Sequence, residues 1–425
     1  MHILHIASGN FFSTYGGGQV YVRNLVDEFI RQASIKVSVL SFTGAESVQE
    51  KDYHSITIYE TGELTDVDLT AFLKKIKPDI IHAHSHKAQM CRVGKSLNIP
   101  VVVTAHHGGI VCPAGALMNC KDEICHVPVS HRNCLKCVLR NTRTGLLWYP
   151  LMKLLPESLY IKIGKLLGRL PFIYFVTPIG KAALSIKNKQ KEWQTIINDC
   201  SLMIAPSEAT KDAMIGNGLP NNKVTVLPHG IPLPNEVPPF PTIEGGIRFF
   251  YVGRICYVKG IHVLLEAFHQ LKDTKVQLHL IGGSGNKEER RYEKRLQEKY
   301  KNDNRIIWHG KIPPDKMYQN IKGYHISVGP SICLEIYGLN IAESLSMGKP
   351  VLATKCGGAE MQIIDGTNGW LVLPNSAKEM LKKMEVIIDM GYDKLSFISK
   401  NCRAISIEHH YNSLANIYNK QLYQL

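Results

Sequence analysis

Short hydrophobic runs alternate with amphipathic stretches along most of the chain. In the first half, β-branched runs of this kind lie at 2–7, 36–42, 79–84 and 101–106. The alternation returns in the second half with runs at 248–253, 276–282, 305–310, 325–330 and 350–354. Near-continuous apolar strands separated by helical segments are typical of a parallel sheet that is covered on both faces. The pattern therefore predicts an α/β protein.

A proline-rich segment separates the two sets of runs. Six of the fourteen residues from 228 to 241 are proline, and proline can continue neither a helix interior nor a central strand. We expect two doubly wound, Rossmann-like domains that face each other across a cleft, at 1–230 and 242–405. Residues 231–241 would form the linker, and the pattern of 406–425 predicts a C-terminal helix.

The composition is that of a chain with a sizeable buried core. Of the 425 residues, 44% are hydrophobic and 20% are charged, which excludes a wholly disordered protein. No run approaches the roughly 18 apolar residues that a membrane-spanning helix needs. The N-terminal stretch turns polar by Ser8 without a basic leader. We interpret it as the first strand of a cytoplasmic protein and not as a secretory signal.

The positive charge is concentrated in one block. The formal net charge is +14, and residues 136–191 hold eleven Lys or Arg residues but only one acid, Glu157. Apolar and aromatic residues are interleaved with Lys153, Lys162, Lys165, Arg169 and Lys181. A helix with a cationic face and an apolar face suits an anionic membrane surface. The alternative is a helix packed on its own domain. No nucleic-acid-reading motif accompanies the charge, so we expect no nucleic acid as partner.

Two glycine-containing turns are suited to hold an anion. Three glycines at 16–18 stand between the first predicted strand and a helix, where backbone can approach a ligand closely. In the second domain, Gly253-Arg254 ends a strand and Lys259-Gly260 precedes a helix. An arginine fork and a lysine charge beside a helix N-terminus form a diphosphate clamp. The alternatives are a flexible turn and two solvated surface charges.

The segment 330–358 carries two acids near the start of a predicted helix. Seven residues separate Glu335 from Glu343, Gly338 lies between them, and the helix is expected to begin near Leu339. Both carboxylates would then lie near the positive end of the helix. There they could accept hydrogen bonds from sugar hydroxyls, while loop amides face phosphate. Two ordinary acids at a helix start are the alternative.

Taken together, these motifs resemble the retaining glycosyltransferases of family 4, which have the two-lobed GT-B fold. In the second half, the resemblance rests on Gly253-Arg254, Lys259-Gly260, Pro330-Ser331, Glu335-x7-Glu343, Gly348-x-Pro350-Val351, Gly357-Gly358 and Asn368-Gly369. In the first half, it rests on Gly17-Gly18, Asp79-x-x-His82, Thr104-x-His106 and Ser207-Glu208-Ala209-Thr210. The chain departs from the family pattern at His107, where Asp is common, and at His229, where Asn is common.

The resemblance implies roles for the site residues. Arg254 and Lys259 would stabilise the charge that develops on a departing diphosphate, so that catalysis needs no metal or other cofactor. His106 would face the donor sugar, Glu335 would position it, and Glu343 would accept the ribose hydroxyls. The predicted catalytic residues are His106, Glu335, Arg254 and Lys259. The predicted donor-binding residues are Gly17, Gly18, Gly253, Arg254, Lys259, Tyr337, Gly338, Leu339 and Glu343.

The function so implied is transfer of a hexosyl-type sugar, with retention, from a nucleotide-diphosphate-sugar to an acceptor hydroxyl. The basic segment suggests a lipid-linked or surface-polysaccharide glycan as acceptor, and a peripheral position on the cytoplasmic face of the membrane. The alternatives are another GT-B enzyme, namely a sugar-nucleotide epimerase or a glycan phosphorylase, and a noncatalytic scaffold that keeps a GT-B shell.

Five of the eleven cysteines lie within 26 residues. Cys134 and Cys137 have the spacing at which two thiolates reach one zinc ion. Some family-4 enzymes carry a similar insert, and on that likeness the ligands of a structural zinc would be Cys112, Cys125, Cys134 and Cys137. Cys120 would be spare, and His126 or His131 could substitute. The alternative is a loop of reduced thiols.

Histidines at 82, 84, 86, 106 and 107 invite a second metal interpretation. The first three point the same way only if the strand continues through Ser85. We expect packing at the strand ends in preference to metal binding.

Overall fold

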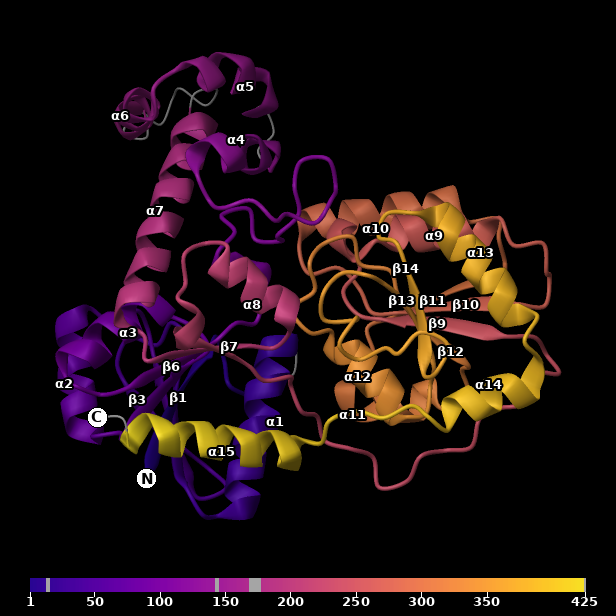
Figure 1. Ribbon diagram of the computed structural model, residues 1–425, viewed down its shortest axis with the longest axis horizontal. Helices are drawn as coiled ribbons and strands as arrows, with labels where there is room; N and C mark the ends of the chain where they lie inside the picture. Colours follow the sequence, from indigo (N-terminus) through magenta and orange to yellow (C-terminus); the bar gives the residue numbers. More distant parts are fainter. Residues whose placement is uncertain (13–15, 142–144, 168–176, 424–425) are drawn as a thin grey trace. The chain divides into compact units, whose positions relative to one another are not determined.

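The computed structural model describes residues 1–425 except 13–15, 142–144, 168–176 and 424–425. The chain forms two compact units, coloured along the sequence in Figure 1. The first comprises Met1–Lys121, Cys125–Leu227 and the chain from Tyr411 onward, and the second comprises Asp122–Ile124 and Pro228–His410. The division falls at the start of the proline-rich segment, and most of the C-terminal helix belongs to the first unit.

The first unit is built on an eight-stranded sheet of order β3-β4-β2-β1-β5-β6-β7-β8. Its strands are β1 (His2–Ser8), β2 (Lys36–Phe42), β3 (Gln49–Tyr53), β4 (Ile56–Thr61), β5 (Ile80–Ala83), β6 (Val101–Thr104), β7 (Leu202–Ala205) and β8 (Val224–Val226). Neighbouring strands are parallel except at the edge, where β3 is antiparallel to β4. The helices are α1 (Gly17–Gln32), α2 (Asp66–Ile76), α3 (Lys87–Ser96), α4 (His131–Arg140), α5 (Gly145–Leu154), α6 (Glu157–Leu167), α7 (Thr177–Asp199), α8 (Glu208–Ile215) and α15 (Ile407–Tyr423).

Helices cover both faces of this sheet. On one face, the ring of Phe29 in α1 contacts Tyr411 and Tyr418 of α15, with centroids 4.7 and 6.2 Å apart. On the other face, α3 packs beside the side chain of Ile81 in β5. This double covering explains why β5 and β6, in the middle of the sheet, are buried along their whole length.

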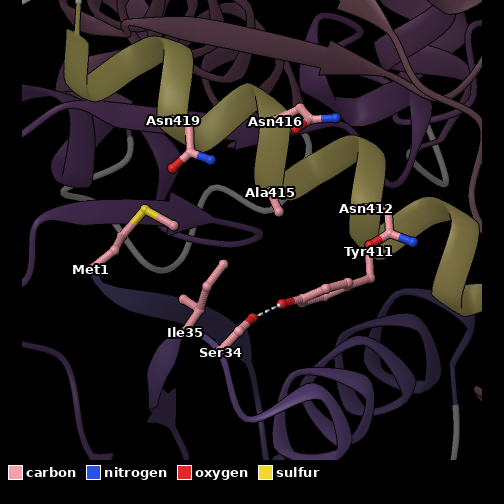
Figure 2. A pocket seen from close by; sticks show the side chains of 8 residues that line it. All are labelled: Met1, Ser34, Ile35, Tyr411, Asn412, Ala415, Asn416 and Asn419. Carbon is pink, nitrogen blue, oxygen red and sulfur yellow. Dashed lines mark hydrogen bonds between the residues drawn. The ribbon is translucent and has the colours of Figure 1, made fainter.

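The helix α15 lies beside the loop that leads into β2. Figure 2 shows the Tyr411 hydroxyl pointing at Ser34, and the two oxygens are 2.6 Å apart. A pocket of about 420 Å³ lies between Ile35 and the asparagine-bearing side of α15. No predicted site residue lines this pocket, so it marks the seam where α15 docks.

The basic segment folds into helices that gather on α7. The helices α4, α5 and α6 pack against α7, which also contacts α3 (Figure 1). Arg169 lies outside the described residues, as do the side chains of Lys165 and Lys181. Within the part of the chain that the structure describes, no helix is long and apolar enough to cross a membrane.

The second unit is built on a six-stranded parallel sheet of order β11-β10-β9-β12-β13-β14. Its strands are β9 (Arg248–Val252), β10 (Gln277–Ile281), β11 (Ile306–Gly310), β12 (Ile326–Gly329), β13 (Val351–Thr354) and β14 (Gly369–Val372). Its helices are α9 (Ile261–His269), α10 (Lys287–Lys299), α11 (Pro314–Ile321), α12 (Leu339–Ser346), α13 (Ala377–Ile388) and α14 (Gly391–Ser399). Alternate residues of β9 face two cores: Phe249 packs with α9 and α13, and Phe250 packs with α11.

The two Rossmann-like sheets confirm the predicted fold class. Every strand predicted from the hydrophobic runs forms, with its ends shifted by at most two residues. The strands β3, β4, β7, β8 and β14 were not predicted. The sequence of β3, QEKDY, is polar and mostly exposed, and β8 has only three residues, so neither produces a hydrophobic run.

In both sheets the strand order reverses beside the first strand of the unit. The reversal lies between β1 and β5 in the first sheet and between β9 and β12 in the second. Ligands of doubly wound sheets bind beyond the carboxyl ends of the strands at such a switch point. The loops that follow β9 and β12 hold Arg254, Lys259 and Glu335, so the fold places three predicted site residues where a ligand is expected.

Candidate active site

The loop after β9 packs tightly on the loop after β12. Gly260 has φ +69°, and a Cβ atom there would lie 1.9 Å from the carbonyl oxygen of Pro330. Only glycine tolerates both conditions. The amide of Ile332 also donates to Val258 O at 3.0 Å. The two loops therefore form one surface, on which Lys259 lies next to the residues after Pro330.

Lys259 forms a partly buried ion pair with Glu335. Its Nζ donates to Glu335 Oε1, and the same oxygen accepts a bond from Ser331 Oγ at 2.5 Å. Burial by itself lowers the pKa of Lys259, but the Glu335 carboxylate outweighs it and raises the pKa above the usual lysine value. Burial likewise opposes ionisation of Glu335, yet Lys259 holds that pKa below its usual value. Both groups are therefore charged at neutral pH.

Backbone bonds from a third loop hold Glu335. Its amide donates to Cys356 O at 2.7 Å, and its carbonyl accepts from Gly358 N at 2.8 Å. Cys356 and Gly358 follow β13. The loops after β9, β12 and β13 thus meet at the Lys259–Glu335 pair.

Arg254 is held more loosely than Lys259. Its Nη1 lies 3.5 Å from Glu289 Oε1, and 56% of its side chain is exposed. The Tyr251 hydroxyl donates to the Arg254 carbonyl at 2.8 Å and fixes the backbone there. Arg254 also helps to lower the pKa of Glu335. The guanidinium is therefore near the ion pair and within reach of an anion from solvent.

The helix α12 begins at Leu339, as predicted, directly after Gly338. The Asn340 side chain donates to Val252 O at 3.2 Å, which ties the start of the helix to the end of β9. Glu343 lies in the next turn, and burial raises the pKa of its carboxyl to about 7. Such a group readily exchanges hydrogen bonds with hydroxyls, because near neutral pH it is present in both protonation states.

Tyr337 is held by packing. Its ring is buried against the imidazole of His229, with centroids 5.4 Å apart. The Gln362 side chain donates to the Tyr337 carbonyl at 2.6 Å. The predicted contact between Tyr337 and the donor would therefore use the backbone of Tyr337 and not its ring.

In the first unit, the glycine turn lies against His106. A Cβ atom on Gly18 would lie 3.4 Å from both Cβ and Cγ of His106, so the glycine turn packs directly against the imidazole. Gly17 is the first residue of α1. His107 takes a different role, because its Nδ1 accepts a bond from Gly109 N at 3.0 Å.

Three neighbours of the predicted residues were not predicted. They are Ser331, which bonds Glu335, Glu289, which pairs with Arg254, and His84, whose Nδ1 lies 2.9 Å from His106 Nε2. Ser331 stands in a motif already noted, four residues before Glu335. Glu289 has no such signal, because it reaches Arg254 only through the fold.

The predicted zinc ligands gather in the first unit. Burial raises the pKa of Cys134 to about 12 and of Cys137 to about 11, and it also raises that of Cys125. Cys112, Cys125, Cys134 and Cys137 form six pairs. In each pair, the negative charge of one thiolate raises the pKa of the other cysteine further. Cys120 raises the pKa of Cys125 and Cys137 in the same way, so these shifts show that the five thiols are near one another without distinguishing four ligands from the fifth.

The four cysteines do not form a group whose ligand atoms all lie within 4.8 Å of one another; among the described residues, a set of three histidines does. The ligand atoms of His5, His82 and His84 all lie within 4.8 Å of one another. His86 is not part of this group, because β5 ends at Ala83 and His86 stacks on Phe42, with centroids 3.6 Å apart.

Two family models match the chain. The model for Glycosyl transferases group 1 matches residues 235–404, and the model for Glycosyltransferase Family 4 matches residues 15–117. Together the two matches cover more than half of the chain, and each lies in a different half.

Curated relatives include two lipopolysaccharide enzymes. The chain is 30% identical over 202 residues to the lipopolysaccharide 1,2-N-acetylglucosaminetransferase of Salmonella typhimurium, a match that covers 43% of this chain and 52% of that protein. It is 28% identical over 177 residues to the lipopolysaccharide 1,6-galactosyltransferase of Escherichia coli, covering 40% and 48%. The chain thus spans about half the length of these relatives.

Solved structures share the fold over the full length. HepE of Anabaena, in complex with UDP, aligns with a TM-score of 0.67 at 17% identity, covering 99% of this chain and 100% of that chain. Sucrose-phosphate synthase of Thermosynechococcus elongatus aligns with a TM-score of 0.68 at 18% identity, covering 100% of both chains. Both family models match, and each unit has the Rossmann-like sheet of one GT-B lobe. The chain therefore belongs to the family-4-like glycosyltransferases of the GT-B fold.

Proposed function

We propose that the protein is a retaining glycosyltransferase that moves a hexosyl group from a nucleoside-diphosphate-sugar to a hydroxyl of a surface glycan. The observation that carries the proposal is the meeting of Arg254, Lys259 and Glu335 at the β9/β12 switch point. Relatives named for lipopolysaccharide sugar transfer support the class of acceptor. The HepE structure with UDP-glucose makes a uridine diphosphate sugar the first donor to test.

The difficult step is cleavage of the bond between the sugar C1 and the diphosphate oxygen. Its electron pair stays on the diphosphate, and the sugar acquires oxocarbenium character. Lys259 is a fixed charge, because Glu335 and Ser331 hold it in place. The side chain of Arg254, which is loosely paired with Glu289, would move to bind the diphosphate. Fixed cations lower the barrier because they are already oriented when the charge develops, so catalysis needs no metal ion.

The two acids would bind the rest of the donor. Oε1 of Glu335 takes the bonds from Lys259 and Ser331, so we assign Oε2 to a sugar hydroxyl. Glu343, near the start of α12, would bond the ribose hydroxyls. The acceptor oxygen then forms its bond to C1 on the face that the diphosphate leaves, and the acceptor proton passes to the departing phosphate oxygen. These bond and proton transfers balance without a protein base, and the product keeps the anomeric configuration of the donor.

We also propose that α5 and α6 dock on an anionic lipid surface. One side of α5 exposes Leu147, Leu151 and Leu154, the first and last with 79% and 81% of their area accessible. Their spacing places them on one helix face. Lys153 of α5 and Lys162 of α6 are exposed as well. Leucines beside lysines match the apolar and charged layers of a membrane interface, which would hold the enzyme peripherally where a lipid-linked acceptor lies.

We further propose a structural zinc bound by Cys112, Cys125, Cys134 and Cys137. Cys134 and Cys137 are three residues apart on α4 and so share a face. Their raised pKa values mean that the metal would displace thiol protons. The ion would join the loop that follows the turn at Gly108–Ile110 to α4 and would take no part in the chemistry.

Loss of either clamp cation should slow sugar transfer. Arg254→Ala and Lys259→Ala are each expected to lower kcat by about 10²-fold, as removal of one oriented charge donor typically does. Lys301→Ala, at an exposed surface lysine, is the control and should have no effect. The assay follows uridine diphosphate release without added Mg²⁺ or Mn²⁺, and proton NMR of the product should show the anomeric configuration of the donor. Near-wild-type transfer by the double variant would contradict the clamp.

Glu343 should make stability fall as the pH rises. The folded carboxyl has a pKa of about 7, above its usual value of 4.5, so the native state binds the proton more tightly than the unfolded chain does. The cost of ionisation therefore grows between about pH 5 and pH 8. Glu343→Gln should raise Tm at pH 8 by on the order of 2–4 °C and leave it nearly unchanged at pH 5. Equal shifts at the two pH values, measured by thermal unfolding, would refute the assignment.

Vesicle binding should depend on the exposed leucines. Leu147→Gln combined with Leu154→Gln should lower partitioning onto phosphatidylglycerol-containing vesicles at least about tenfold, since a buried leucine contributes about 1.5–3 kcal/mol. Val67→Gln is the matched control, because Val67 is equally exposed in the first unit but lies on α2. Equal sedimentation of the double variant and wild type would rule out docking through α5.

Purified protein should carry about one equivalent of zinc by elemental analysis, as a single tetrathiolate site requires. Cys134→Ser with Cys137→Ser should abolish it, whereas Cys120→Ser should leave it in place. Less than a tenth of an equivalent in wild-type protein, purified without chelator, would end the proposal.

A further inference from the structure

Two lysines and a histidine gather beyond the carboxyl edge of the first sheet. Lys87 is the first residue of α3, which follows β5, and His107 follows β6. Lys189 belongs to the C-terminal half of α7, the helix that leads from α4, α5 and α6 to the sheet and contacts α3 (Figure 1). Three separate elements thus bring these side chains to the edge at which doubly wound sheets bind their ligands.

The three side chains are near enough to influence one another's charge. Burial, together with the positive charge of Lys189, lowers the pKa of Lys87 to about 8. Burial also lowers the pKa of His107, and Lys87 and Lys189 both add to that shift. No carboxylate of the described residues counteracts either shift. At neutral pH, Lys87 is therefore mostly charged and His107 mostly neutral, in a region with excess positive charge.

Lys87 has no acidic partner among the residues that the structure describes. Its Nζ donates to the carbonyl oxygen of His84 at 2.6 Å, and the side chain is half-buried. An ammonium group that is partly removed from water without a counter-ion costs free energy. One carbonyl dipole offsets only part of that cost, so a bound anion would stabilise the charged form of Lys87.

Lys189 has an acidic neighbour that it can release. Its Nζ lies 2.8 Å from Oε2 of Glu192, three residues further along α7, and 54% of the Glu192 side chain is exposed. Ion pairs between adjacent turns of a helix surface contribute little to stability. Lys189 can therefore exchange Glu192 for a ligand at a small cost in free energy.

His107 supplies a neutral hydrogen-bond donor. Its Nδ1 accepts a bond from the Gly109 amide at 3.0 Å, so the neutral ring carries its proton on Nε2. His107 is exposed, and its Nε2–H group can therefore donate to a ligand from solvent.

The chemistry of the three groups favours phosphate over carboxylate as their ligand. Phosphate presents oxygens in several directions, which suits donors that come from three separate elements, and lysine binds it as a point charge. A planar carboxylate is typically bound by the fork of an arginine. No arginine of the described residues contributes to the shifts at Lys87 or His107.

We propose that Lys87, Lys189 and His107 bind a phosphate group of the glycan acceptor. His84 places this site beside the predicted catalytic histidine, because its carbonyl accepts the bond from Lys87 and its ring bonds His106. The phosphate is either the link between a glycan and its lipid or an ester on a sugar residue. That the anion belongs to the acceptor rests on the proposed function, whereas the phosphate site itself does not.

Chemical labelling of lysines tests the site in full-length wild-type protein without a transfer assay. Amines are acylated and then located by mass spectrometry, with farnesyl diphosphate as the probe for a lipid link and glucose 6-phosphate as the probe for a sugar ester. We expect at least one probe to protect Lys87 and Lys189 while Lys95 of α3 and Lys191 of α7, both exposed, stay reactive. Farnesol and glucose are the uncharged controls.

The probe that protects identifies the source of the phosphate. Protection by farnesyl diphosphate alone indicates a lipid-linked acceptor, protection by glucose 6-phosphate alone indicates a phosphorylated sugar, and protection by both shows that the phosphate itself is recognised. Protection by neither probe, or equal protection by the uncharged controls, would overturn the proposal.

Matched variants separate a built site from general attraction to a basic protein. Lys87→Gln combined with Lys189→Gln should raise the Kd of the protecting probe at least about tenfold, because two charge-assisted hydrogen bonds are lost. Lys95→Gln combined with Lys191→Gln removes two charges from the same two helices and should leave the Kd unchanged. Affinity is measured by isothermal titration with excess uridine diphosphate present. An equal loss of affinity in the two double variants would contradict the site.

His107→Asp covers the case in which the double lysine variant does not fold. His107 is exposed, so the substitution should leave the fold intact, and it places a negative charge beside Lys87. We expect the Kd of the probe to rise at least about tenfold here too, since a charge-assisted bond is replaced by repulsion. An unchanged Kd would remove His107 and overturn the proposed set of ligands.

The possible outcomes distinguish this proposal from the function on which it draws. Phosphate-dependent protection of Lys87 and Lys189 in a protein that transfers no sugar would uphold the anion site and count against the proposed function. Sugar transfer by a protein in which neither probe protects these lysines would uphold the function and overturn the site.

Discussion

In the second unit, the candidate donor site is built around Lys259, which keeps its charge although only 26% of its side chain is exposed. Taking an ammonium group out of water is costly unless an opposite charge accompanies it. Glu335 supplies that charge to Lys259, and Ser331 bonds the same carboxylate oxygen. Because Glu335 is also bonded through its backbone to Cys356 and Gly358, the pair fixes the loops after three strands. The positions of Lys259 and Glu335 in the candidate donor site therefore depend on this one pair.

The two clamp cations, Lys259 and Arg254, differ in how firmly their side chains are held in place. Lys259 is 26% exposed and closely paired with Glu335, whereas Arg254 is 56% exposed and lies 3.5 Å from Glu289. A rigid charge is already in place when charge develops on the substrate, and a mobile one can follow it. In the first unit, hydrogen bonds join the rings of His5, His84 and His106.

The sequence predicted those parts of the fold and of the candidate site that depend on residues close together in the chain. The apolar runs of β2 and β9 and the glycine before α12 are visible in sequence because each depends on its own neighbours. Glu289 was not predicted because it meets Arg254 across 35 positions of sequence. His5 could have been noticed as an imidazole in the middle of an apolar strand. Its bond to His84, however, depends on the pairing of β1 with β5, which no run of residues encodes.

The most direct test of the account is a crystal structure of the full-length protein with uridine diphosphate bound. The account predicts the two phosphates within hydrogen-bonding distance of Arg254 and Lys259, beyond the carboxyl ends of β9 and β12, with the ribose hydroxyls at Glu343. A nucleotide bound away from these three residues would contradict it.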